Sequence, residues 1–218
     1  MMKPLNEYID HTYLHAAASP DDIIQLCREA QEYDFYAICV NSSYVYLAKR
    51  ELKDSEVKIA STVGFPLGAC STKAKVTEAR QAIKDGADEI DMVLNVGFLK
   101  SGLHKSVKED IEAVKKAIGK KVLKVILETC YLTDEEKKIA CLIADKAGAD
   151  YVKTSTGFGS GGATQDDVKL MRSSIGNAVK VKASGGIGSR VEALEYIELG
   201  VDRIGTSRGI HLIKGASE

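Results

Sequence analysis

A lysine, Lys153, stands inside the short apolar run of the segment ADYVKTSTGFGSGG, Ala149 to Gly162, directly before a glycine-rich stretch. Lysine is almost never fully buried in a protein unless it has a partner or a chemical role. The residues before it have strand character, and the threonine, serine and glycines after it are typical of a loop. The segment therefore predicts a strand that delivers a reactive amine to the edge of a sheet.

Further charged residues stand in other apolar runs of strand character. Asp91 lies between two apolar residues in DEIDMVLN, so strand alternation places it on the opposite, inward face. Lys124 stands in the middle of KVLKVILE, and Lys180 and Lys182 share one face of VKVKASGGI. We expect one acid and several lysines to converge in the interior of the fold.

This convergence has two readings, a buried layer of salt bridges and a site for Schiff-base chemistry. A lysine amine attacks a carbonyl only when it is neutral, and its ordinary pKa is about 10.4. Burial and a neighbouring ammonium group both disfavour the charged form, and together they can bring the pKa to roughly 7–8. Lys153 with Lys182 beside it supplies that pairing. Asp91, alone or through water, can move protons during dehydration of the carbinolamine and the change at the carbon–carbon bond.

Three glycine-rich loops follow the last three strands that the sequence predicts. They read TGFGSGG, SGGIGSR and GTSRG. Glycine lets backbone N–H groups approach an anion closely, and a helix that starts after the loop adds a favourable dipole. Any one of these runs is also compatible with an ordinary turn. Three of them on neighbouring strands favour a phosphate site.

The elements that must position these residues alternate regularly along the chain. The phrases DGADEIDMV, AGADYVKTS and LGVDRIGTS each join an amphipathic helical stretch to a strand through a glycine at the helix end. We predict strands at about Tyr8–Tyr13, Tyr36–Val40, Lys58–Val63, Glu89–Leu94, Val122–Glu128, Tyr151–Ser155, Val179–Ala183 and Arg203–Thr206. We predict helices at about Pro20–Tyr33, Ser43–Leu52, Ser71–Lys84, Ser106–Ile118, Asp134–Ala147, Gln165–Ser174 and Arg190–Glu198, with a short one after Ser207.

Strict alternation of strand and helix implies a parallel sheet and an α/β fold. Eight units in a chain of 218 residues fit one (β/α)₈ TIM barrel, a single catalytic domain over residues 1–218. A doubly wound open sheet needs a glycine-rich turn after its first strand, and IDHTYLHAAAS has no glycine there. A barrel places its active site at the carboxyl ends of the strands, where the lysines and the glycine-rich loops stand.

Composition narrows the classes of partner. The 30 basic and 31 acidic residues nearly cancel, so we expect no nucleic-acid or membrane partner. The N-terminal segment has no apolar region of a signal peptide, and no run is long enough for a membrane span, which predicts a cytoplasmic protein.

The five cysteines are widely spaced and read as reduced thiols. The four histidines do not form a ligand pattern, so we expect no metal.

The motifs that carry this chemistry resemble those of the 2-deoxy-D-ribose-5-phosphate aldolases, a family of class I, metal-independent aldolases. The resemblance covers nearly the whole chain, through YIDHTYL, AICVN, STVGFPLG, GADEIDMVLNVG, LKVILET, YVKTSTGF, VKASGGI and RIGTS. VKTSTGF and VKASGGI at their spacing are highly specific together. The resemblance implies reversible cleavage of deoxyribose 5-phosphate to glyceraldehyde 3-phosphate and acetaldehyde, within deoxyribose phosphate catabolism. It also implies no cofactor and a homodimer or homotetramer.

The resemblance also implies residue roles. Lys153 matches the Schiff-base lysine, Lys182 the lysine that perturbs it, and Asp91 the acid that works with a water as proton donor and acceptor. The residues that match the proton relay and the site of the substrate hydroxyl are Asp10, Thr12 and Lys124. The residues that match phosphate-side positions are Thr156, Gly157, Gly185, Gly186, Gly205 and Ser207.

Several positions depart from the family pattern. Some members carry a lysine after KTSTG, and here Phe158 stands in its place. A serine often follows the TS of the last strand, and here it is Arg208, which we expect to restore the missing phosphate-side charge. Some members end in a tyrosine that assists proton transfer, whereas this chain ends in IKGASE.

Two alternatives remain open from the sequence. One is a different Schiff-base aldolase with a keto donor, which donor preference would separate. The other is a catalytically silent barrel that binds a sugar phosphate as a sensor. The intact set of Lys153, Lys182 and Asp91 argues against a sensor, because a binding protein gains little from a neutral buried lysine.

Overall fold

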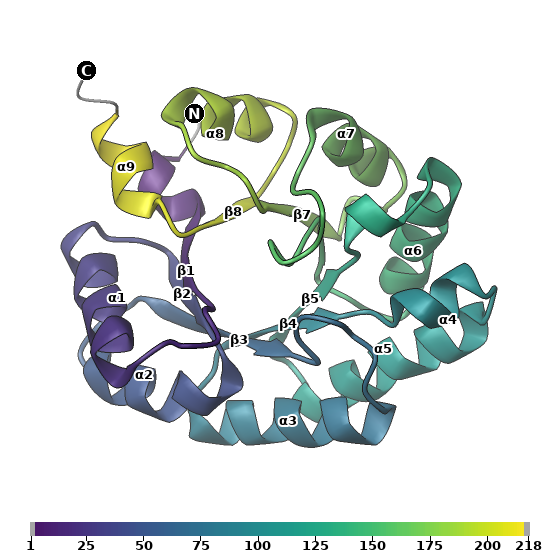
Figure 1. Cartoon of the computed structure of the whole chain (residues 1–218), viewed down its shortest axis with the longest axis horizontal. Helices are drawn as coiled ribbons and strands as arrows, with labels where there is room; N and C mark the ends of the chain where they lie inside the picture. The colour runs from purple at the N-terminus through teal and green to yellow at the C-terminus, as the bar shows by residue number, and fades with distance from the viewer. Residues whose placement is uncertain (1–2, 216–218) are drawn as a thin grey trace.

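Eight parallel strands close into a barrel in the computed structural model, which describes residues 3–215. Each strand pairs with the next along the chain, and β8 closes the barrel against β1 (Figure 1). The strands are β1 (Ile9–Tyr13), β2 (Ala37–Val40), β3 (Lys58–Val63), β4 (Glu89–Val93), β5 (Val122–Ile126), β6 (Tyr151–Lys153), β7 (Lys180–Ser184) and β8 (Arg203–Thr206). The predicted fold class, a (β/α)₈ barrel, is confirmed.

The helices form an outer ring around the strands (Figure 1). The α-helices are α1 (Pro20–Glu32), α2 (Val45–Glu51), α3 (Thr72–Asp85), α4 (Val96–Lys100), α5 (His104–Ile118), α6 (Asp134–Lys146), α7 (Gln165–Ser173), α8 (Arg190–Glu198) and α9 (Gly209–Lys214). Short 3₁₀ helices are η1 (Leu5–Tyr8), η2 (Ser42–Tyr44) and η3 (Thr129–Tyr131). The first and last described elements lie together, because α9 packs on η1 and β1.

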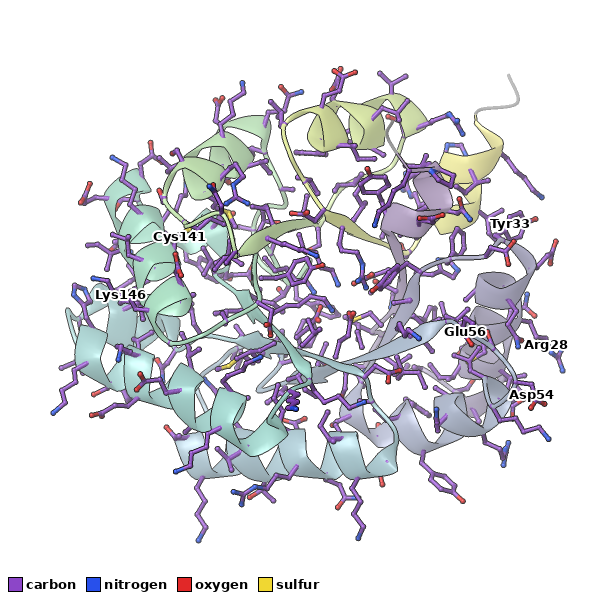
Figure 2. The ribbon with its side chains drawn as sticks, turned by 180° about the vertical axis from the view of Figure 1, so that it is seen from behind. Arg28, Tyr33, Asp54, Glu56, Cys141 and Lys146 are labelled. Carbon is purple, nitrogen blue, oxygen red and sulfur yellow. The ribbon has the colours of Figure 1, made fainter. Side chains whose placement is uncertain are left out.

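The apolar core lies between the strands and the helices, because alternate strand residues point outward. Ile38 of β2, Ile90 of β4 and Val181 of β7 belong to this layer and are fully buried. Figure 2 shows polar side chains leaving the outer ring on opposite sides, with Arg28 on α1 and Lys146 on α6. The inward strand positions are thereby left free for the residues of the site.

Helix starts follow the local sequence. Ser19 accepts a hydrogen bond from the backbone N–H of Asp22, and Thr133 does the same with Glu136, so that α1 and α6 each begin with a capping box. The helices end near their predicted positions. The sequence did not predict α4, a single turn that Asn95 caps through the N–H of Phe98, because five residues carry no readable helical period.

Two predictions concern residues beyond this description. The C-terminal residues 216–218, considered above for proton transfer, and residues 1 and 2 of the N-terminal segment lie outside the described residues. Between residues 3 and 215, no helix has the length and apolar character needed to cross a lipid bilayer.

The loop after β3 lies directly against the end of β4. Gly68 has a φ of +65°, and a Cβ built on it would lie 2.0 Å from the carbonyl oxygen of Leu94. Its N–H donates to the carbonyl of Gly64 at 2.7 Å. Glycine is therefore required here for space as well as for backbone conformation, and it fixes one side of the barrel mouth.

Gly68→Ala should destabilise the protein more than Gly102→Ala does. Both glycines have a left-handed φ, but Gly102 has no atom within 4 Å of a built Cβ, so it serves as the matched control. We expect about 1–2 kcal/mol for Gly102→Ala from backbone strain, and about 1–3 kcal/mol more for Gly68→Ala from the clash with Leu94. Urea unfolding followed by circular dichroism measures both. Equal losses would contradict this account of the loop.

Candidate active site

Lys153 is the last residue of β6, and its side chain points into the barrel near the carboxyl end. It is 2% exposed and lines a pocket that opens there. Its Nζ donates to Oδ2 of Asp91 at 2.9 Å. Strand alternation and the register of β6 against β5 and β7 place it, with Lys153 opposite Ile126 and Lys182.

Lys182 lies beside Lys153, because the two residues are register partners on β7 and β6. Its Nζ donates to the same Asp91 oxygen at 2.8 Å and also to Oδ2 of Asp10. Lys182, Asp91 and Asp10 have no exposed surface. The structure thus brings together the predicted lysine pair and the predicted acid.

Lys124 on β5 joins the same cluster. Its Nζ donates to Oδ1 of Asp91 at 2.7 Å and lies 2.5 Å from Oε2 of Glu89 and 3.7 Å from Oδ2 of Asp10. Arg203 on β8 joins the cluster on the side away from the pocket. We call these buried side chains the interior charge network: Asp10, Glu89, Asp91, Lys124, Lys153, Lys182 and Arg203.

The environment shifts the pKa values of Lys153 and Lys182 in opposite directions. Burial lowers the pKa of Lys153, and the Lys182 ammonium lowers it further against the opposing effect of Asp91. Burial also acts against the charge of Lys182, but the Asp10 and Asp91 carboxylates outweigh it and raise the pKa of Lys182. Burial likewise opposes the charge of Asp91, but Lys124, Lys153 and Lys182 hold its pKa well below the usual range. The arrangement thus shifts Lys153 toward the neutral amine and Lys182 toward the charged ammonium form.

The pocket above Lys153 has a volume of about 420 Å³. Its walls come largely from the glycine-rich loops after β6, β7 and β8. All the predicted phosphate-side residues line it: Thr156, Gly157, Gly185, Gly186, Gly205, Ser207 and Arg208. The side chain of Arg208 lies beside Gly188, where a built Cβ would meet its Nη1 at 2.8 Å. A cation and glycine backbone therefore surround one end of the pocket, which suits an anionic group.

The loops after β6 and β7 pack backbone against backbone. A Cβ on Gly162 would lie 2.2 Å from the carbonyl oxygen of Gly185, and the N–H of Ala163 donates to that oxygen at 3.0 Å. Ser184 Oγ donates to the carbonyl of Ser155 at 2.6 Å. Small residues at these positions hold the two loops together at the pocket.

Thr12 lines the pocket from the end of β1, and its Oγ1 donates to the carbonyl of Asp10 at 2.8 Å. An apolar cluster of Leu14, Cys39, Ala60 and Phe65 lies at the ends of the first three strands. Cys39 is fully buried, with its Sγ 3.9 Å from Asp91, and burial raises the pKa of its thiol. The barrel mouth therefore has an apolar side as well as the glycine-rich side.

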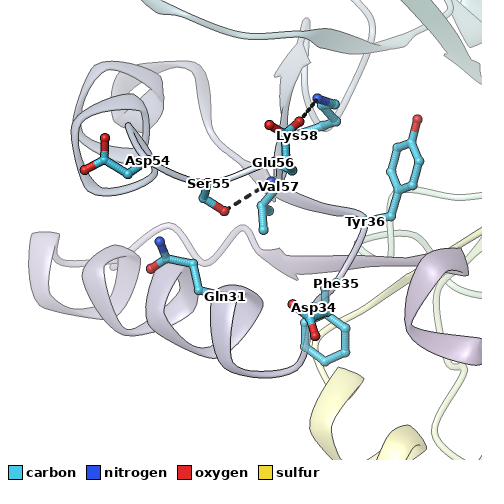
Figure 3. A pocket seen from close by; sticks show the side chains of 9 residues that line it. All are labelled: Gln31, Asp34, Phe35, Tyr36, Asp54, Ser55, Glu56, Val57 and Lys58. Atoms are coloured by element: carbon cyan, nitrogen blue, oxygen red, sulfur yellow. Dashed lines mark hydrogen bonds and ion pairs between the residues drawn. The ribbon is translucent and has the colours of Figure 1, made fainter.

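A second hollow, of about 470 Å³, lies at the amino-terminal ends of β2 and β3, on the other end of the barrel (Figure 3). Figure 3 shows Lys58 paired with Glu56 beside Tyr36. No residue of the interior charge network lines it. The candidate active site is therefore the pocket at the carboxyl end of the barrel, which Lys153 lines. Lys180, expected on the same face as Lys182, also lies at the amino end, exposed, with its Nζ 5.6 Å from the centre of the Tyr151 ring.

Two other observations bear on metals and thiols. Within residues 3–215, no group of three or more histidine, cysteine, aspartate or glutamate side chains is arranged to hold a metal ion. Cys27, Cys39, Cys70, Cys130 and Cys141 are all free thiols, as predicted. His11 is buried, and its Nε2 lies 2.7 Å from Glu29 Oε2, in agreement with a structural role.

The sequence did not identify three charged residues at the site. Glu89 and Arg203 belong to the interior charge network, and their signal was the period of two that places them on the same faces as Asp91 and Gly205. Glu128 follows β5 with a φ of +56° and is 3% exposed. Its carboxylate accepts hydrogen bonds from the N–H and the hydroxyl of Thr156, so it anchors the loop after β6.

Comparisons with known proteins agree with this geometry. The model of the DeoC/LacD family aldolases matches residues 6–210. A deoxyribose-phosphate aldolase of Finegoldia magna is 58% identical over 211 residues, which are 97% of this chain and 99% of that protein.

Solved structures agree as well. The structure of the aldolase QR15 superposes with a TM-score of 0.94 at 42% identity, over 98% of this chain and 96% of that one. A tetrameric deoxyribose phosphate aldolase of Aeropyrum pernix superposes with a TM-score of 0.88 at 31% identity, over 96% and 89%. Because the family model matches residues 6–210, almost the whole of this chain, the chain belongs to the DeoC/LacD family of aldolases.

Proposed function

We propose that this chain is a Schiff-base aldolase that reversibly cleaves 2-deoxy-D-ribose 5-phosphate to D-glyceraldehyde 3-phosphate and acetaldehyde. One observation carries the proposal. A buried lysine whose pKa is lowered lies beside a second lysine whose pKa is raised, and it lines a pocket with glycine loops and an arginine at one end. The names of the relatives support the same substrate.

The first step is imine formation at Lys153. Its neutral amine attacks C1 of the open-chain sugar, and the carbinolamine then loses water. Asp91 lies within hydrogen-bond distance of both Lys153 and Lys182, so a proton can pass among these three groups without crossing bulk solvent. Lys124 holds Asp91 in place and Asp10 holds Lys182 in place, through the contacts described above.

The second step is cleavage of the bond between C2 and C3. Asp91, through a water, accepts the proton of the C3 hydroxyl as the bond between C2 and C3 breaks and glyceraldehyde 3-phosphate departs. The protonated imine nitrogen takes up the electron pair, which gives an enamine. Protonation at C2 and hydrolysis then release acetaldehyde and restore Lys153. The phosphate binds at the loops after β6, β7 and β8, with Ser207 and Arg208 as donors, and so fixes C3 above the amine.

The proposal extends to the setting of the enzyme. We expect it to need no cofactor and to act in the cytoplasm on deoxyribose phosphate from nucleotide breakdown. We also expect a homodimer or homotetramer, which the tetramer described for the Aeropyrum pernix relative supports.

Borohydride reduction in the presence of acetaldehyde should attach a two-carbon adduct to Lys153. Peptide mapping by mass spectrometry locates the label, and a label on Lys182 would reverse the two roles. Lys153→Ala should abolish turnover, and a chelator should leave the wild-type rate unchanged. A marked preference for dihydroxyacetone phosphate as donor over acetaldehyde would instead identify an aldolase with a keto donor.

Lys182→Leu should move the acidic limb of the pH–rate profile to higher pH. Removing the neighbouring ammonium leaves Asp91 free to stabilise a charged Lys153, so the pKa of Lys153 rises and the free amine forms only at higher pH. The profile of kcat/KM against pH measures the shift. An acidic limb that stays in place would contradict the role given to Lys182.

Arg208→Ala should raise KM for deoxyribose 5-phosphate by roughly tenfold or more, in line with about 1.5–3 kcal/mol for a charged hydrogen bond. The rate with unphosphorylated deoxyribose should hardly change, because that substrate lacks the anion. Arg28→Ala removes an exposed arginine on α1, outside the pocket, and is the matched control. Equal effects of Arg208→Ala on both substrates would mean that Arg208 acts through folding.

A further inference from the structure

Arg203 lies at the far end of the interior charge network from the pocket. It comes from the start of β8 and is 2% exposed. Its Nε donates to Oδ1 of Asp10 at 2.6 Å, and its two terminal nitrogens donate to the carboxylate of Glu89 at 3.2 and 3.0 Å. The ring of Tyr36 covers the guanidinium, with Cζ 3.7 Å from the ring centre. Arg203 is thus a buried cation that bonds two carboxylates and does not line the pocket.

Glu89 couples this cation to the lysines above it. It accepts from both terminal nitrogens of Arg203 and lies 2.5 Å from Nζ of Lys124. Lys124 in turn donates a hydrogen bond to Asp91, and Asp91 also accepts a hydrogen bond from Lys153. Contacts of ion-pair length therefore run without interruption from the amino end of the barrel to Lys153. The charge at one end of this chain bears on the charge at the other, because the interior is screened far less than bulk water.

The network contains one basic group more than it has carboxylates. The basic groups are Lys124, Lys153, Lys182 and Arg203, and the carboxylates are Asp10, Glu89 and Asp91. Arg203 cannot lose its proton in a protein, and Lys124 and Lys182 each contact at least two carboxylates. Lys153 contacts one carboxylate and is the basic group that borders the pocket. Three carboxylates balance three cations, so the interior is neutral when Lys153 carries no charge.

We propose that Glu89 and Arg203 are positioning residues that fix the charge state of Lys153 from the opposite end of the barrel. This inference rests on the proposed Schiff-base function and adds a control that acts at a distance from the substrate. Arg203 supplies the third cation, which completes the balance without Lys153. Glu89 supplies the third carboxylate, so that three carboxylates match the three other cations when Lys153 is neutral.

Other titratable groups border the interior charge network, but they do not change its number of cations and carboxylates. Cys39 faces Asp91 and Lys153, and burial keeps its thiol protonated. Tyr151, below Lys153 on β6, has a pKa raised by burial and stays neutral. Glu128 at the mouth bonds Thr156 and joins no ion pair within the described residues. Lys58 and Lys180, at the amino end, are half-buried and exposed, and Lys58 pairs with Glu56.

The test compares Glu89→Gln, Arg203→Met and the double variant. Without Arg203, the remaining three cations, Lys153 included, match three carboxylates, so the acidic limb should move to higher pH. Without the Glu89 charge, three cations face two carboxylates even with Lys153 neutral, so the limb should move to lower pH. The double variant restores the balance, and its limb should return toward wild type. Each single shift should be about one pH unit, the order expected from removing one buried charge.

The readout is the pH dependence of acetaldehyde trapping on Lys153 by cyanoborohydride, measured by mass spectrometry together with kcat/KM. Asp110→Asn removes a buried carboxylate that pairs with Lys75 outside the barrel interior, and it should leave the pH profile unchanged. Circular dichroism reports folding. If variants with Arg203→Met do not fold, Glu89→Gln alone decides, and an acidic limb that does not move to lower pH overturns the inference.

Two outcomes separate this inference from the function on which it rests. Shifts of the two single variants in the same direction, or a double variant that does not return toward wild type, would overturn it and leave a merely structural role for both residues. Trapping of wild-type Lys153 would still support the Schiff-base function in that case. No trapping in the wild type would instead remove the proposed function itself.

Discussion

One carboxylate, Asp91, accepts hydrogen bonds from Lys124, Lys153 and Lys182 at 2.7, 2.9 and 2.8 Å. Burying three ammonium groups around one acid is unfavourable unless further carboxylates share the charge, and Asp10 and Glu89 do so. The other demands on the structure follow from this contact. Four strands, β4 to β7, must present these side chains at matching heights, and the residues around them must exclude water.

The inward and outward faces of the barrel sheet therefore have different roles. In many (β/α)₈ barrels, bulky branched side chains fill the interior, whereas here much of it is charged and fully bonded. Such a network gives little net stability, because the desolvation of each ion offsets the attraction between them. The apolar layer between strands and helices must supply most of the stability, and residues such as Ile38 and Val181 are packed there without exposed surface.

The period of two along a strand was enough to predict Asp91, Lys124, Lys153 and Lys182 as inward residues, because each stands out against apolar neighbours. Arg203 obeys the same period, but its bond to Asp10 joins β8 to β1 where the sheet closes, and its bonds to Glu89 cross the barrel to β4. Both contacts depend on the stagger of the closed sheet. That stagger is a property of the whole ring, and no local stretch of sequence displays it.

The left-handed backbone at Glu128 was also hidden, because the residue type does not favour it. Its contacts with Thr156 are visible only once the loop after β6 has a shape. The glycines that line the pocket, by contrast, could be predicted, because their clustering after three consecutive strands is itself a local signal.

The pairing of Arg203 with Asp10 spans 193 positions of the chain, and that of Lys182 with Asp10 spans 172. During synthesis, a chain that has emerged only as far as β6 already holds Asp10, Glu89 and Asp91 but lacks two of their cations. The interior of the barrel cannot become dry until β7 and β8 arrive and β8 meets β1, because the acids would otherwise be buried without partners. Closure of the ring, electrostatic completion of its interior and assembly of the pocket are thus one late event.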